Sequence, residues 1–107
     1  MPAPTNIPTT IETINNLRQS GRLAEAYNLA YALSTETDCQ EVDFCMFWVC
    51  HDTALYFIRR DEYDNAKSWW KYAEGLFEKS LMDFSEVKTA LSRIRRQLNP
   101  HYTVIRQ

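Results

Sequence analysis

The sequence predicts one all-α domain of about five helices, arranged as antiparallel hairpins that stack on one another. Three observations support this fold class. The chain has two glycines, and Pro100 is its only proline after residue 8, so helix breakers are few. Apolar residues recur at spacings of three and four, the period of an amphipathic helix. A length of 107 residues with 45% hydrophobic content suits one compact core.

A flexible, proline-rich leader is expected over residues 1–9, followed by the helical domain over residues 10–98. Thr9 or Thr10 is the expected N-cap of the first helix, because a threonine hydroxyl can accept a hydrogen bond from a free N–H of the first turn. This helix should end at Gly21, which interrupts the helical pattern.

The second helix is expected over residues 23–33, where leucine and alanine recur at spacings of three, four and three. Residues 34–40 are polar and predict a connection. The third helix should span residues 42–59. Its segment 44–50 (FCMFWVC) is apolar all round, so this helix is expected to lie between neighbours or to face a partner. A buried strand is the alternative, but the apolar pattern continues beyond residue 50 without a turn signal.

The fourth helix is expected over residues 63–79 and the fifth over residues 84–98, where apolar residues recur at three-four-three-four spacing. Asn99-Pro100 should stop the fifth helix. Residues 99–107 are expected to form a short C-terminal tail.

The fourth helix carries the most informative pattern. Its packing face consists of Tyr63, Ala66, Trp70 and Ala73, at spacings of three, four and three. The two alanines allow a neighbouring helix to approach closely, and the two aromatic rings fill the space beside it. This alternation predicts a hairpin built to stack on other hairpins.

The turn and the helix after it occur twice. Residues 21–26 align with residues 61–66, and an apolar residue precedes each turn by four positions. This pattern resembles the tetratricopeptide repeat (TPR), a helix-turn-helix unit of 34 residues. The resemblance implies a short TPR-like solenoid of about two and a half divergent repeats. There are departures: the two units lie forty residues apart, and Thr53 stands where the family usually has a large apolar residue.

The resemblance also implies a binding groove for a peptide or partner along the first helix of each unit. The positions carried over are Glu12, Asn15, Gln19, Trp48, His51, Asp52, Leu55 and Arg59. The last five also share one helical face by spacing alone. Alternatively, His51 and Asp52 are ordinary surface groups and Trp48 belongs to the core. A carboxylate at Asp52 would repel an acidic peptide end, so the family's carboxylate clamp is not expected here.

Aromatic residues make up 13% of the chain, which is high for a small helical domain. Trp69, Tyr72 and Leu76 form a second stripe on the fourth helix and predict self-association or docking onto another domain. The alternative is that Trp69 and Tyr72 pack against the long first connection or the tail.

Cysteine and histidine raise the question of a zinc site, but their spacing does not support one. Cys45 and Cys50 lie about 140° apart around a helix, and neither a CxxC nor an HxxxH motif occurs. Free thiols, with Cys39 the third, fit a reducing cytoplasmic setting. No glycine-rich phosphate loop and no pair of carboxylates with a histidine is found. The sequence therefore predicts a non-enzymatic interaction module without a metal or a cofactor.

The net charge of −2 gives little support for binding to nucleic acid or membranes, and no run of apolar residues is long enough to span a bilayer. The expected partner is therefore a protein, a peptide or a second copy of the chain. The alternative is a small helical regulator whose fifth helix contacts nucleic acid through Arg93, Arg95 and Arg96, with Arg106 beyond it.

Overall fold

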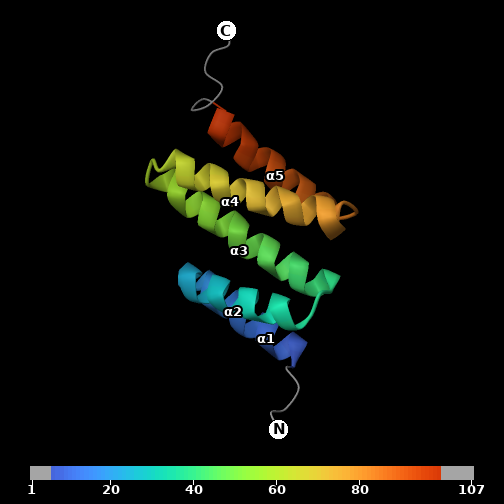
Figure 1. Cartoon of the computed structure of the whole chain (residues 1–107). Helices are drawn as coiled ribbons and strands as arrows, with labels where there is room; N and C mark the ends of the chain where they lie inside the picture. The colour runs from blue at the N-terminus through green and yellow to red at the C-terminus, as the bar shows by residue number, and fades with distance from the viewer. Residues whose placement is uncertain (1–5, 100–107) are drawn as a thin grey trace.

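The computed structural model describes residues 6–99 and is all-α over that range, without a strand. This confirms the prediction of an all-α fold with about five helices. In chain order the helices are α1 (Ile7–Gln19), α2 (Leu23–Glu36), α3 (Gln40–Arg59), α4 (Tyr63–Leu76) and α5 (Ser85–Leu98), and a π-helical segment, η1 (Phe77–Leu81), continues α4 (Figure 1).

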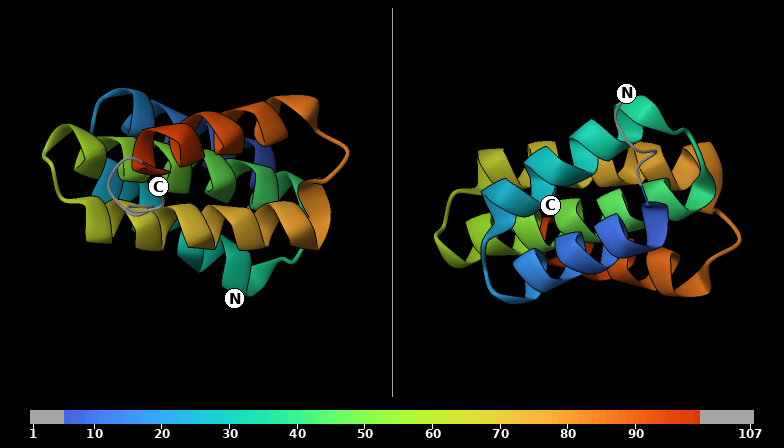
Figure 2. Two further views of the ribbon diagram at one scale, coloured as in Figure 1. Left: turned by 90° about the horizontal axis from the view of Figure 1, so that it is seen from above. Right: turned by 90° about the horizontal axis from the view of Figure 1, so that it is seen from below.

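Successive helices alternate in direction, and α3 lies at the centre of the arrangement (Figures 1 and 2). α1 packs on α2, α3 packs on α4, and α3 contacts every other helix as well as η1. This explains the apolar run in the third helix: Cys45, Met46, Phe47, Val49 and Cys50 are all buried. Such a helix needs neighbours around most of its circumference, and α3 has them.

The internal repeat predicted from the sequence is present in the backbone. Gly21 and Asp61 occupy equivalent turns, and both have positive φ, 81° and 59°. In each turn this residue donates its N–H to the carbonyl three residues earlier, and the next residue donates to the carbonyl five residues earlier, at 2.9–3.0 Å. The forty-residue period is therefore a structural repeat.

The packing face predicted on the fourth helix is largely confirmed. Ala66, Trp70 and Ala73 are buried, and the Trp70 indole N–H donates to the Leu91 carbonyl of α5 at 3.0 Å. Tyr63 is only half-buried, and its hydroxyl donates to Asp61 in the turn. The alanines let α4 approach its neighbours closely, and Trp70 bridges to α5.

The start of the first helix differs from the prediction. Asn6 is the N-cap, and its side-chain oxygen accepts a hydrogen bond from the Thr9 N–H at 2.9 Å. Thr9 and Thr10 therefore lie inside the helix, and the expected N-cap at either of them is wrong. Asparagine caps helices at least as well as threonine does, and Pro8 is tolerated in the first turn because its missing N–H would be unpaired there. Residues 1–5 of the predicted leader lie outside the described residues.

The residues by which the forty-residue period exceeds the TPR period of 34 lie mainly in longer helices and not in a longer loop. α2 continues to Glu36 and α3 begins at Gln40, so the connection covers only residues 37–39 instead of the predicted 34–40. After α4, residues 77–81 form the π-helical segment η1 instead of the regular helix expected up to Lys79. Polar contacts hold η1 against the start of α3: the Ser80 hydroxyl donates to the buried carboxylate of Asp43 at 2.8 Å.

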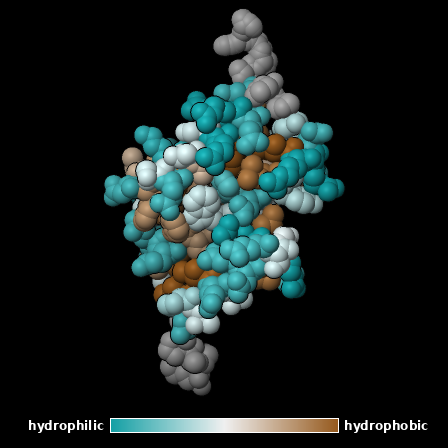
Figure 3. All heavy atoms as spheres, turned by 180° about the vertical axis from the view of Figure 1, so that it is seen from behind, coloured by the Kyte–Doolittle hydropathy of each residue, from teal (hydrophilic) through white to brown (hydrophobic). Residues whose placement is uncertain are grey.

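The fifth helix buries the predicted apolar face and presents a polar surface outward. Its buried residues are Val87, Ala90, Leu91, Ile94 and Leu98. The surface seen in Figure 3 is mostly polar, with apolar side chains exposed in small separate patches. Within residues 6–99, no helix combines the length and the hydropathy needed to cross a bilayer. The predicted tail lies outside the described residues, apart from Asn99.

Candidate functional site

Two adjoining depressions lie near the turn between α1 and α2. The first, which we call the α1–α3 groove, has a volume of about 340 Å³. It is lined by Arg18, Gln19, Gly21, Leu23, Asp52, Leu55, Tyr56 and Arg59. Four of the eight residues predicted for a partner-binding groove, Gln19, Asp52, Leu55 and Arg59, are therefore brought together here.

A charged network forms one wall of the α1–α3 groove. The Arg18 guanidinium on α1 donates to one Asp52 oxygen at 2.9 Å, and His51 Nδ1 lies 2.8 Å from the other. Because a carboxylate oxygen only accepts, His51 must carry the proton on Nδ1. Burial alone would raise the pKa of Asp52, but the hydrogen bonds from His51 and Arg18 and the nearby Arg18 charge hold this pKa below its ordinary value.

This network changes the chemical role expected of Asp52. Taken from the sequence alone, Asp52 repels an acidic ligand. In the structure its charge is compensated by Arg18, so Arg59 is the groove cation that has no hydrogen bond or ion pair with another described residue. Sequence reasoning missed Arg18 because its partner lies 34 residues away, and no local pattern pairs two residues at that distance.

The other predicted groove residues lie outside this depression. Trp48 is half-buried, and its ring meets Phe47 at 4.9 Å and His51 at 5.0 Å between centroids. Trp48 thus lies in an aromatic cluster packed against the core, whereas His51 and Asp52 are half-buried and not the ordinary surface groups of the alternative interpretation. On α1, Glu12 is exposed and Asn15 is half-buried, and neither lines the α1–α3 groove.

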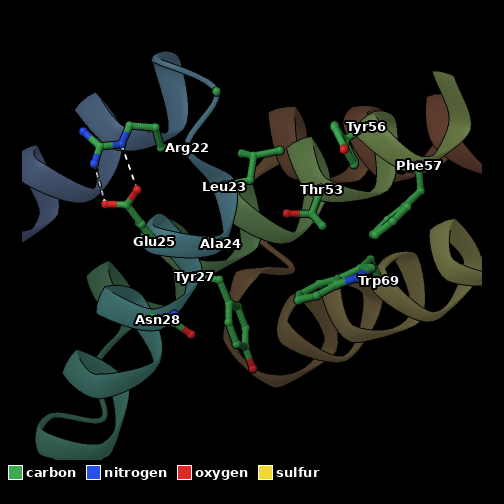
Figure 4. A pocket seen from close by; sticks show the side chains of 11 residues that line it. Arg22, Leu23, Ala24, Glu25, Tyr27, Asn28, Thr53, Tyr56, Phe57 and Trp69 are labelled. Carbon is green, nitrogen blue, oxygen red and sulfur yellow. Dashed lines mark hydrogen bonds and ion pairs between the residues drawn. The ribbon is translucent and has the colours of Figure 1, made fainter. Parts of the chain in front are cut away.

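The second depression lies between α2, α3 and α4 and has a volume of about 470 Å³. We call it the α2–α4 pocket. Its wall is mainly apolar and includes Leu23, Tyr27, Thr53, Tyr56, Phe57 and Trp69, which Figure 4 shows from close by. Leu23 and Tyr56 also line the α1–α3 groove, so the two depressions share one border.

The aromatic stripe predicted for self-association is partly covered by α2. Tyr27 meets the Trp69 ring edge-to-face at 5.1 Å, and Tyr72 stacks on Trp69 with parallel rings 6.1 Å apart. Trp69 and Leu76 are half-buried, whereas Tyr72 is 37% exposed and Tyr31, on α2, is 51% exposed. The cover comes from α2 and not from the connection between α2 and α3. The tail, the other expected cover, lies outside the described residues.

The cysteines are placed as small apolar side chains. Burial raises the pKa of Cys45 to about 11, although Arg18 lowers it slightly, and raises the pKa of Cys50 to about 12. Both thiols are therefore protonated at neutral pH and poor nucleophiles. Cys39 is the half-buried N-cap of α3. Within residues 6–99, no three histidine, cysteine or acidic side chains are grouped so that they could hold a metal ion.

Charge is distributed unevenly along the chain. Residues 85–99 carry four basic side chains and one acidic one, whereas residues 6–84 carry seven basic and thirteen acidic ones. Arg93, Arg95 and Arg96 are all exposed on α5, and Arg106 lies outside the described residues. The domain thus combines an acidic body with one basic helix.

Comparison with known proteins adds nothing to this geometry: no family model, no curated protein and no solved structure matches the chain. What the two depressions can bind is therefore argued from their own residues.

Proposed function

We propose that this domain is a non-enzymatic protein-interaction module, a short TPR-like scaffold that binds a peptide or partner segment in the α1–α3 groove. One observation carries the proposal: the groove is lined both by polar side chains that have no partner among the described residues and by apolar side chains. Gln19 and Arg59 line it without a hydrogen bond or ion pair to another described residue, and Leu23 and Leu55 lie beside them. Such a surface can hold a peptide by charged hydrogen bonds and apolar contact.

The backbone repeat supports a TPR-like architecture. The turns at Gly21 and Asp61 have the same hydrogen bonds, and both turns lead into helices that bury alanine at equivalent positions, Ala26 and Ala66. Helix hairpins that repeat in this way stack through their neighbours and leave side-chain surfaces for binding. The paired, half-buried charges of Arg18 and Asp52 would hold the groove wall in shape before a ligand arrives.

The groove is tested by reversing the charge of Arg59. Immobilised wild-type protein and an Arg59→Glu variant are compared for the proteins they retain, identified by mass spectrometry. We expect Arg59→Glu to lose at least one partner that the wild type retains. Lys71→Glu is the control, because it also reverses a positive charge, at an exposed position on α4 that lines neither depression, and should retain the same partners as the wild type. Retention of the same partners by Arg59→Glu would contradict the proposal. Trp48→Ala is unsuitable, because Trp48 packs against Phe47.

We also propose a cytoplasmic setting, which the three unpaired cysteines support. A homo-oligomer is compatible with the interaction function, and its surface is considered in the Discussion.

A second candidate function is nucleic-acid binding through α5, favoured by the uneven charge distribution. Replacing Arg93, Arg95 and Arg96 together by Glu should abolish affinity for duplex DNA, measured by fluorescence anisotropy at low salt. The three side chains are exposed, so the fold should persist. An affinity that does not change would exclude this function.

A further inference from the structure

We infer that the α2–α4 pocket binds a lysine or arginine side chain carried by a basic segment of a partner protein. This site adjoins the α1–α3 groove and shares Leu23 and Tyr56 with it, but the inference is argued from the residues of the pocket and does not depend on the function proposed for the groove.

The pocket exists because a small residue forms its base. Thr53 is 8% exposed, and its hydroxyl donates to the Val49 carbonyl at 2.7 Å, so its polar atom is already satisfied by the helix. In Figure 4, Thr53 lies between Leu23 on one side and Phe57 and Trp69 on the other. The space above it measures about 470 Å³ and has mainly apolar walls. These walls suit the alkyl stem of a lysine or arginine.

The rings around the pocket favour a positive charge at the end of that stem. Tyr27, Tyr56, Phe57 and Trp69 all contribute to the wall. Aromatic faces carry negative charge density, and tryptophan and tyrosine bind cations best. This rim already holds one such contact, because the Arg60 guanidinium lies 5.3 Å from the centre of the Tyr56 ring.

The net charge of the part of the chain that forms the pocket also favours a basic ligand. Residues 6–84, which form all of the pocket, carry six more acidic than basic side chains. Arg22 and Glu25, which also line the pocket, pair with each other at 2.7 Å, so their charges cancel. At the turn into α4, the exposed Asp61, Glu62 and Asp64 outnumber Arg59 and Arg60 by one. The net negative charge of residues 6–84 attracts a basic segment and repels an acidic one. Charge complementarity therefore identifies the partner as basic.

The experiment compares three fluorescein-labelled peptides of equal length. The first contains Lys, Arg and Leu; in the second Gln replaces the basic residues, and in the third Glu replaces them. Binding to the full chain is measured by fluorescence anisotropy at low and high salt. We expect the basic peptide to bind about tenfold more tightly than the neutral one, the acidic peptide not to bind, and the basic affinity to fall with salt.

The decisive variant fills the pocket. Thr53→Leu should weaken binding of the basic peptide about tenfold by occupying the space of the alkyl stem. Thr13→Leu is the matched control, because Thr13 occupies the equivalent position forty residues earlier and its hydroxyl likewise donates to the carbonyl four residues back, Thr9. Thr13 is exposed on α1 and does not line the pocket. Tyr56→Gln, at a 43% exposed position, removes one ring without touching the buried core and should also weaken binding.

Circular dichroism and thermal unfolding verify that each variant is folded. Equal affinity for the basic and neutral peptides would overturn the inference, because it would make the pocket a simple apolar site. Unchanged binding by both Thr53→Leu and Tyr56→Gln would place the basic peptide elsewhere on the acidic surface. Self-association that is lost in Thr53→Leu and in a variant with Arg93 and Arg96 replaced by Glu would make the occupant a second copy of the chain.

Discussion

At the scale of single residues, several side chains form hydrogen bonds or ion pairs with residues more than twenty positions away in the sequence. Asp52 is compensated by Arg18 from another helix, and Trp70 hydrogen-bonds to the backbone of α5. The Nε of Arg18 is buried without a hydrogen-bond partner, so Asp52 is the group that stabilises this cation. Removing one member of such a partly buried pair leaves the other charge uncompensated.

We therefore predict that Asp52→Asn destabilises the protein by about 1–3 kcal/mol at pH 7. The pKa of Asp52 is lower in the folded than in the unfolded protein, so its stabilising effect is present above the unfolded value of about 3.9 and is lost as pH falls through the folded pKa. The difference between wild type and variant should thus disappear at strongly acidic pH. Urea denaturation at several pH values measures it.

Asp64→Asn is the matched control for this prediction, because Asp64 is an exposed carboxylate on α4. It should change stability by less than about 0.5 kcal/mol at any pH. A difference for Asp52→Asn that stays constant down to pH 2 would show that the effect does not come from the carboxylate charge.

At the scale of elements, the two equivalent turns show how similar backbones arise from different residues. Gly21 adopts positive φ without steric cost because it has no Cβ atom. Asp61 has a Cβ atom and adopts positive φ at a steric cost, and its carboxylate accepts a hydrogen bond from the Tyr63 hydroxyl. The hairpin of α3 and α4 is longer than that of α1 and α2, and polar contacts hold its extended ends together. Ser80 and Lys79 on η1 both contact Asp43 near the start of α3, and Lys79 also contacts Asp38 just before α3.

The same substitution, glycine to alanine, should have opposite effects on stability at Gly21 and at Gly75. A Cβ atom at Gly21 or at Gly75 would meet nothing within 4 Å, so only backbone conformation matters. Gly21→Ala should destabilise the protein by about 1 kcal/mol, because φ is positive there. Gly75→Ala, inside α4, should stabilise it by about 0.5–1 kcal/mol. Thermal unfolding measures both, and a shift of the same sign in the two variants would contradict the argument.

At the scale of the whole molecule, both terminal helices face outward with polar residues. α5 exposes Lys88, Ser92 and its arginines, and α1 exposes Glu12, Thr13 and Asn16. Polar outer faces of this kind cap stacked helical units and oppose end-to-end growth. Association of two copies should therefore use the surface of α2 and α4, where Tyr31 and Tyr72 are exposed.

We predict that the wild-type sedimentation coefficient rises with protein concentration and that Tyr72→Lys removes this rise by placing a charge in the aromatic stripe. Met82→Lys is the control: Met82 is 64% exposed but lies outside the stripe, so the same exchange should leave association unchanged. A wild type that remains monomeric at every concentration would exclude self-association through Trp69, Tyr72 and Leu76.

Much of the fold could be predicted because it depends on neighbours in the sequence. The buried residues of α2 and α5, the packing face of α4 and the repeated turn all follow from spacings of three and four and from a residue able to adopt positive φ. The N-cap was not predicted correctly because Asn6 and Thr9 are both good capping residues, and the sequence does not show at which of them the helix begins.

The candidate sites were predicted only in part. The face shared by Asp52, Leu55 and Arg59 follows from helical period, and these residues do line the α1–α3 groove. Arg18 and Tyr27 were missed, because their partners Asp52 and Trp69 lie on other helices. Thr53 was noted as a departure from the family pattern, but the space above it follows only from the packing of three helices.

The chain's own pattern of large, small and polar residues thus determined that it forms helices, where most of them turn and which face of each is buried, since these depend on interactions within one or two helical turns. The tertiary structure alone decided that Arg18 neutralises Asp52, that α2 covers Trp69 and that a pocket opens over Thr53. Such contacts join residues more than twenty positions apart, and their distances depend on how whole helices approach one another.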